Sequence, residues 1–151
     1  MKQVQKSVLL WYSPHEMYAL VTAVEDYPTF LPWCERVEVL ERGEQVGTAR
    51  LWLRYAGLHH CFTTRNTNEA DRSVHLQLVD GPFSMLDGHW LFKPIGAAEA
   101  TAVQACKIEF SMRYAFAQGP LEALISPVFD RIANTFVEAF VKRAEQVYGA
   151  R

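Results

Sequence analysis

The chain has 151 residues and a formal charge of −2, and 50% of its residues are apolar. That length suffices for one domain that buries roughly 70% of its unfolded surface, so a core can form without metals or disulfides. The small charge excludes nucleic-acid binding driven by bulk charge, although a local basic patch stays open. Three widely spaced cysteines fit neither a disulfide framework nor a paired zinc-ligand pattern, and they indicate a reducing compartment.

The sequence shows no membrane-spanning or targeting segment. Its apolar runs all fall short of the ~20 residues that a transmembrane helix needs, and its first residues, Met-Lys-Gln-Val-Gln-Lys, form neither a signal core nor an Arg-rich presequence. It also contains no repeats or linker-like stretches. We therefore expect one domain over residues 1–151 in the cytoplasm, with peripheral contact with the inner membrane as an open alternative.

The first elements are predicted from alternation and from capping residues. Residues 4–12 read as a strand. Ser13 then offers an N-cap, with Pro14 at the first helical position and Glu16 three residues after the cap, which is the arrangement of a capping box. We expect a short helix as far as Val24 and a second short helical turn soon after it.

Residues 27–34, Tyr-Pro-Thr-Phe-Leu-Pro-Trp-Cys, form a stiff apolar connection. Proline lacks an amide donor and pushes the preceding residue out of the helical region, so the two prolines oppose a long regular element. Surface connections are usually polar, so an apolar one indicates a surface to cover or a ligand to bind. Residues 80–88, Asp-Gly-Pro-Phe-Ser-Met-Leu-Asp-Gly, have the same character. We interpret the two segments as the lips of a pocket.

The middle of the chain has a period of two, which is typical of strands with one apolar and one polar face. Short gaps with Gly, Asn or Asp separate the strands and favour an antiparallel meander. The predicted strands are residues 36–42, 48–55, 59–67, 74–79, 89–95 and 102–114.

The chain ends in a long predicted helix with a wide apolar stripe. Gly119-Pro120 marks its start, and Pro127 either bends it or makes Ser126 a second start. The stripe comprises Leu121, Leu124, Ile125, Val128, Phe129, Ile132, Phe136, Phe140, Ala144 and Val147. Together the elements predict an α+β fold, in which a curved antiparallel sheet of about seven strands wraps around the C-terminal helix.

The apolar excess predicts a ligand cavity between the sheet and this helix, because a curved sheet that grips one helix rarely closes completely. Ligand pockets are concave and mostly hydrophobic, with few polar groups. The alternative is an ordinary core. The candidate ligand-binding residues are Tyr27, Leu31, Trp33, Tyr55, Phe62, Phe83, Trp90, Phe92, Phe110, Met112, Phe129 and Phe136.

A second candidate surface lies on the opposite, polar face of the sheet. Arg50 and Arg54 flank Trp52 on one face of one strand, and Arg65 is near in sequence. A basic stripe with an aromatic side chain is suited to RNA or phosphate. Interleaved acidic residues leave a merely solvated face as the alternative.

The sequence offers no evident catalytic or metal site. His59 and His60 are adjacent on a strand and therefore face opposite sides. His75 and His89 lie on separate predicted strands without metal-site spacing, which indicates surface histidines.

The remaining candidates for chemistry have simpler interpretations. Asp80 and Asp87 flank a Gly-containing loop and are interpreted as turn formers rather than as an acid–base pair. Cys34 lacks the local signature of a nucleophile. We expect no enzymatic activity and no catalytic cofactor.

Three ordered motifs, which span essentially the whole chain, resemble the coenzyme Q-binding START-like family. That family includes the bacterial ribosome association toxin and its cyclase/dehydrase relatives. The motifs are Asp-Tyr-Pro-x-Phe-Leu-Pro-Trp-Cys at 26–34, Leu-Val-Asp-Gly-Pro-Phe at 78–83 followed by Leu-x-Gly-x-Trp-x-Phe at 86–92, and Ala-Phe-x-x-Arg-Ala-x-x-Val-Tyr at 139–148.

The resemblance implies a helix-grip (START-like, Bet v 1-like) fold and two functions. One is non-enzymatic binding of ubiquinone or a related polyisoprenoid lipid in support of respiration, which we take as the first expectation. The other is that of a toxin–antitoxin component that binds the large ribosomal subunit and blocks subunit joining. For this second function, the basic stripe of Arg50, Arg54 and Arg65 is the candidate docking surface. Polyketide cyclase/dehydrase activity is a weaker alternative, and we expect no DNA partner.

Overall fold

The computed structural model describes residues 2–55, 57–96 and 105–151. Within these ranges seven strands form one antiparallel sheet in the spatial order β1-β7-β6-β5-β4-β3-β2. In chain order the elements are β1 (Lys2–Leu10), α1 (Pro14–Thr22), the 3-10 turn η1 (Val24–Asp26), α2 (Tyr27–Phe30), β2 (Cys34–Glu41), β3 (Val46–Tyr55), β4 (Leu58–Glu69), β5 (Ser73–Asp80), β6 (Phe83–Pro94), β7 (Cys106–Phe116) and α3 (Pro120–Tyr148).

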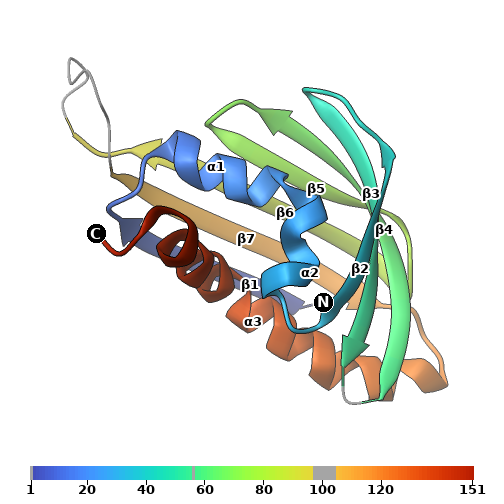
Figure 1. The fold of residues 1–151 in the computed structure, drawn as a ribbon. Helices are drawn as coiled ribbons and strands as arrows, with labels where there is room; N and C mark the ends of the chain where they lie inside the picture. The colour runs from blue at the N-terminus through green and yellow to red at the C-terminus, as the bar shows by residue number, and fades with distance from the viewer. Residues whose placement is uncertain (1, 56, 97–104) are drawn as a thin grey trace.

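All three α-helices cover the same face of the curved sheet (Figure 1). Strands β2 to β7 follow one another as a meander, and β1 then pairs with β7 at the far edge. This arrangement confirms the predicted curved sheet, the two short helices after the first strand and the long C-terminal helix. No helix of the described residues lies on the other face of the sheet, which we call the outer face.

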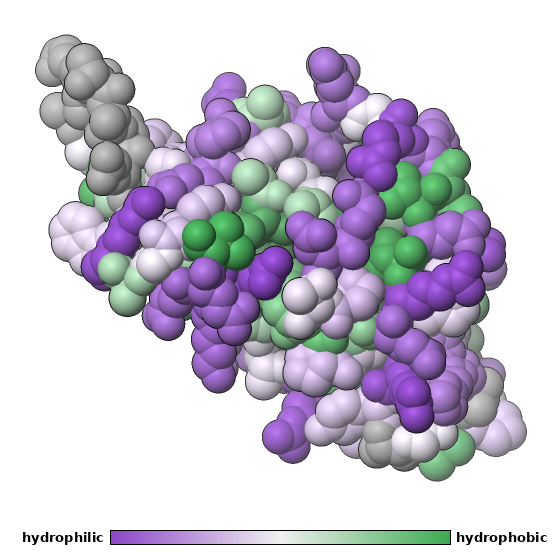
Figure 2. All heavy atoms as spheres, in the orientation of Figure 1, coloured by the Kyte–Doolittle hydropathy of each residue, from purple (hydrophilic) through white to green (hydrophobic). Residues whose placement is uncertain are grey.

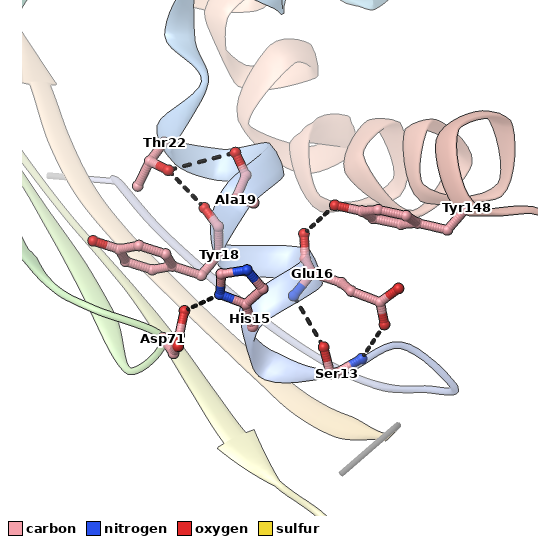
Figure 3. A network of polar contacts seen from close by, with 8 residues as sticks. All are labelled: Ser13, His15, Glu16, Tyr18, Ala19, Thr22, Asp71 and Tyr148. Atoms are coloured by element: carbon pink, nitrogen blue, oxygen red, sulfur yellow. Dashed lines mark hydrogen bonds and ion pairs between the residues drawn. The ribbon is translucent and has the colours of Figure 1, made fainter. Parts of the chain in front are cut away.

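Helix α1 begins at the predicted capping box. Ser13 Oγ accepts a hydrogen bond from the Glu16 backbone N–H at 3.0 Å, and Glu16 Oε1 accepts one from the Ser13 backbone N–H at 2.9 Å (Figure 3). The Tyr148 hydroxyl donates to the Glu16 carbonyl at 2.9 Å, which ties the end of α3 to the start of α1. On the other side of α1, His15 Nδ1 lies 2.8 Å from Asp71 Oδ1 in the β4–β5 turn. Polar contacts therefore fix α1 between the sheet and α3.

Helix α3 runs continuously through Pro127, so Ser126 is not a second start. Leu124 and Val147, which were predicted in the apolar stripe, are instead 55% and 47% exposed, because the stripe that the sheet covers is narrower than the apolar pattern. The side chain of Leu121 lies outside the described residues. Neither α3 nor another helix in the described ranges has the apolar length that crossing a membrane demands. The buried stripe comprises Ile125, Phe129, Ile132, Ala133, Phe136, Val137, Phe140 and Ala144.

Strand β6 begins at Phe83 rather than at residue 89, which corrects the prediction of a second apolar lip over residues 80–88. Only Gly81 and Pro82 connect β5 to β6. Gly81 has a φ of 153°, and a Cβ there would lie 2.7 Å from Phe62 Cβ, so glycine is required. The part of the last predicted strand at residues 102–104 lies outside the described residues, and β7 is described from Cys106.

The core is built around aromatic contacts between the sheet and α3. Trp90 on β6 is fully buried, and its ring centroid lies 4.7 Å from that of Phe110 on β7. The same indole lies 5.2 Å from Phe140 and 5.7 Å from Phe136 on α3. Aromatic pairs at these separations add to the free energy gained by burying apolar area. The cluster therefore holds α3 against the centre of the sheet.

Replacing Phe140 with alanine should destabilise the protein by about 3–5 kcal/mol, because a fully buried aromatic side chain leaves a cavity behind. The free energy of unfolding, measured by urea titration, tests this. Leu124→Ala on the same helix is the control and should change stability by at most about 0.5 kcal/mol, since Leu124 is exposed. Equal losses in the two variants would contradict the role assigned to Phe140.

Candidate functional site

A small cavity lies between the sheet and α3. Its volume is about 50 Å³, and its walls come from η1, α2, the segment after α2, five strands and α3. The lining residues are Val24, Tyr27, Trp33, Leu51, Phe62, Thr64, Asn66, Leu76, Leu86, Met112, Phe129, Ile132, Ala133 and Phe136.

The predicted ligand-binding residues divide into three groups. One group lines the cavity: Tyr27, Trp33, Phe62, Met112, Phe129 and Phe136. A second group lies in the surrounding core, away from the cavity wall: Leu31, Phe83, Trp90, Phe92 and Phe110. Tyr55 stands apart from both groups and lines a groove on the outside of the molecule.

Thr64 and Asn66 give the cavity a polar side that the sequence analysis missed. Both lie on β4 on the same face as Phe62, because side chains two apart on a strand point the same way. Thr64 Oγ1 donates a hydrogen bond to Asn66 Oδ1 at 3.2 Å. The period of two along 62-64-66 is the signal that places them on this face, but as polar residues they do not belong to the apolar pattern that predicts the cavity. Strand β4 therefore adds one hydroxyl and one amide to the largely apolar wall.

The cavity is too small for a lipid in this conformation. Pockets for drug-sized ligands occupy about 300–1,000 Å³, whereas 50 Å³ is of the order of one or two water molecules. On the side that Figure 2 shows, apolar residues form separate patches between hydrophilic ones. A larger ligand can enter only if aromatic side chains of the wall move.

The segment 27–34 forms part of the wall rather than an open lip. Tyr27, Leu31 and Trp33 are all buried. The Tyr27 hydroxyl donates a hydrogen bond to the Val21 carbonyl, and its ring lies 5.4 Å from that of Phe140. Burial raises the pKa of Tyr27, so the phenol stays neutral as a donor. The stiff apolar segment thus closes the core over α3.

A surface groove of about 660 Å³ runs along the outside of this segment, between α2 and α3. The Arg143 guanidinium lies 5.2 Å from the centroid of the Phe30 ring at its edge. Trp33 and Ile132 line both the groove and the inner cavity. These two side chains therefore separate the cavity from the outside.

The outer face of the sheet carries a basic and aromatic cluster on strands β2 to β4. Arg50, Trp52 and Arg54 alternate along β3 and share this face. Arg36 on β2 lies directly opposite Trp52, and Arg65 on β4 lies directly opposite Thr48, so both side chains point to the same face. We call the surface made by Arg36, Arg50, Trp52, Arg54 and Arg65 the β2–β4 face.

The guanidinium groups of Arg36 and Arg50 lie 4.5 Å and 5.8 Å from the centroid of the Trp52 ring, within reach of cation–π attraction. Arg54 pairs with Glu35 at 3.6 Å, and Arg36 pairs with Glu38 at 3.5 Å.

Arg50 and Arg65 have no carboxylate partner among the described residues. Arg50 Nε instead donates to Thr63 Oγ1 at 3.4 Å. Of the three predicted docking arginines, the structure therefore leaves Arg50 and Arg65 free for an anionic partner and neutralises Arg54. Arg36 was missed because its place beside Trp52 depends on the register between β2 and β3.

The histidines and aspartates are arranged differently from the sequence interpretation. Asp87 lies within β6 and not at the end of a loop, so it is not a turn former. It contacts His75 and His89, whose rings stack with centroids 3.9 Å apart. Asp80 ends β5 and is exposed. The two histidines, predicted to be unrelated surface residues, are direct neighbours across β5 and β6.

The cysteines differ in access. Cys34 and Cys106 are buried, and burial raises the pKa of the Cys34 thiol to about 12 and that of Cys106 to about 11. Both therefore stay protonated and unreactive near neutral pH. Cys61 is exposed on β4, directly opposite Trp52 on β3. It is a natural chemical handle on the β2–β4 face.

Comparison with known proteins assigns this arrangement to a family. The family described as polyketide cyclase / dehydrase and lipid transport matches residues 10–141. The chain is 39% identical over 146 residues to the ribosome association toxin RatA of Pseudomonas aeruginosa, covering 97% of each chain. It is 27% identical to the mitochondrial coenzyme Q-binding protein COQ10 homolog B of Xenopus laevis, covering 97% of this chain and 59% of that one.

The fold recurs in the crystal structure of the Zhui aromatase/cyclase from Streptomyces sp. R1128, with a TM-score of 0.78 at 17% identity and 99% coverage of both chains. At that identity the likeness concerns the fold alone. The predicted helix-grip fold is confirmed.

Proposed function

Since the chain belongs to the polyketide cyclase/dehydrase and lipid transport family and is 39% identical to a ribosome association toxin, we propose that it binds the ribosome through its β2–β4 face. The observation that carries this proposal is the cluster of Arg50, Arg65 and Trp52 on a sheet face that no described helix covers. The partner is a ribosomal particle, and the β2–β4 face contacts the ribosomal RNA of that particle.

The chemistry of the β2–β4 face suits RNA. Guanidinium groups bind phosphates through two parallel hydrogen bonds and also stack on bases. Trp52 is partly exposed, and an accessible indole face can stack on an unpaired base, at roughly 1–3 kcal/mol per base. Two guanidinium groups lie within 5.8 Å of the centroid of the Trp52 ring, so stacking and phosphate contacts are available within one patch. Such a patch can attract RNA phosphates despite the net charge of −2, because the positive electrostatic potential around it is local.

We assign the large ribosomal subunit as the target, because the three sequence motifs resemble a family with a member of that role. Binding at the subunit interface would then block subunit joining. The inner cavity supports a binding role rather than catalysis: its described lining contains no Asp, Glu, His, Lys or Arg to form an acid–base pair.

Reversing the charge of Arg50 and Arg65 together should lower the affinity for ribosomal particles at least about tenfold. The slope of the logarithm of the binding constant against the logarithm of the salt concentration should become shallower by about one unit per lost phosphate contact. Cosedimentation with purified large subunits over a range of salt concentrations measures both quantities. Glutamate is the replacement at each position.

The matched control is Arg131→Glu/Lys142→Glu on the helix side, which changes the net charge by the same amount at two exposed positions of α3. This control variant should bind nearly as well as the unmodified protein. Equal losses in both double variants would mean that bulk charge drives binding, and that outcome would contradict docking through the β2–β4 face.

A second function, binding of an apolar molecule with a small polar group, is supported by Thr64 and Asn66 on the wall of the inner cavity. Ubiquinone or a related polyisoprenoid lipid fits this chemistry, since its carbonyl oxygens accept hydrogen bonds while its tail is apolar. Movement of Trp33 would join the cavity to the groove between α2 and α3 and give such a tail a path outward. Each buried CH₂ group would contribute about 0.8 kcal/mol.

Replacing Asn66 with leucine should reduce retention of a quinone severalfold, because it removes the amide and keeps a similar volume. The measurement is titration of the purified protein with a short-chain ubiquinone, together with organic extraction and mass spectrometry of protein isolated from cells. Thr63→Val is the control, since Thr63 lies on the same strand but faces outward with Arg50. If the unmodified protein neither retains nor takes up quinone, the ligand proposal fails, and the ribosome proposal is untouched.

A further inference from the structure

Three side chains with metal-binding atoms meet near the middle of the outer face. His75 lies on β5, the central strand of the sheet, and is the direct cross-strand partner of His89 on β6. Asp87 lies two residues before His89 and therefore points to the same face. Two hydrogen-bonded strands thus fix all three positions, which is a more rigid scaffold than a loop.

The contacts within this cluster are close. His75 Nε2 lies 2.6 Å from Asp87 Oδ1, and His89 Nε2 lies 3.7 Å from Asp87 Oδ2. The imidazole rings stack with centroids 3.9 Å apart and planes at 12°. One donor atom from each residue lies within 4.8 Å of the others. Rotation of the two imidazole rings out of their stacked arrangement would turn the three donors toward one ion.

The cluster is open to solvent. The side chains of His75, Asp87 and His89 are 30%, 23% and 46% exposed, so an ion can reach them from solvent.

We propose that His75, Asp87 and His89 bind a divalent transition-metal ion of the Zn²⁺ class on the outer face of the sheet. Imidazole nitrogen and carboxylate oxygen are ordinary Zn²⁺ ligands, and three protein ligands leave one position open. That position takes water or a donor atom from a partner. The site is separate from the inner cavity and does not depend on the ribosome proposal.

The positive charge of Arg113 disfavours a cation at this site, and its removal provides a specific test. It lies directly opposite Asp87 on β7, and its Nη2 is 3.8 Å from Asp87 Oδ2. Its positive charge competes with a bound cation for the same carboxylate. Removing that charge should therefore strengthen metal binding, whereas a purely structural role of the cluster gives no reason for such a gain.

The experiment is a calorimetric titration of the full chain with Zn²⁺, in a Cys61→Ser background that removes the exposed thiol as a competing ligand. We expect one ion per chain. His75→Ala and His89→Ala should each weaken binding at least tenfold, and Arg113→Gln should strengthen it severalfold. His59→Ala, on the same face but outside the cluster, should have no effect. Circular dichroism of each metal-free variant checks that the fold is retained.

A second measurement keeps the proposal testable if a histidine variant fails to fold. Co²⁺ added to the Cys61→Ser protein should give the visible absorption bands of four-coordinate cobalt with nitrogen and oxygen ligands. A flat spectrum, absence of Zn²⁺ binding, or binding undiminished in a folded His75→Ala/His89→Ala variant would each overturn the proposal.

Discussion

The packing of Trp90 against Phe136 and Phe140 is the interaction on which the rest of the structure depends. It holds α3 in the concave face of the sheet, and the segment 27–34 can then close over the helix through Tyr27. Because an aromatic cluster of this density excludes water and leaves few voids, the inner space is reduced to about 50 Å³. A filled interior stabilises the domain and makes binding of a large apolar ligand depend on rearrangement of its wall.

The same packing determines which surface is free for a partner. The three α-helices of the described residues lie on one side, so none of them covers the outer face, which presents side chains from every strand. Cross-strand pairing then brings together residues that are distant in sequence: Arg36 with Trp52 on one part of this face, and His75 with His89 on another. The sites that we propose on the outer face are therefore built from strands and not from loops.

Most of the fold could be predicted from the sequence, because alternation and capping are local signals. The capping box at Ser13 and the long helix after Gly119 are examples. The start of β6 was missed because Gly, Pro, Ser and Asp in residues 80–88 resemble a loop in composition, although Phe83 and Leu86 pack inward. The cavity volume and the His75–His89 contact could not be predicted, since the first depends on how rings interdigitate and the second on the register between two strands.

Crosslinking from Cys61 tests the central claim most directly, because this exposed thiol lies opposite Trp52 while Cys34 and Cys106 are buried. A photoactivatable reagent attached there should crosslink to RNA of the bound large ribosomal subunit. The same reagent on a Cys61→Ser/Leu124→Cys variant, whose thiol lies on the exposed side of α3, should give little or no product. Crosslinks from position 124 with none from Cys61, in particles that retain the protein, would contradict docking through the β2–β4 face.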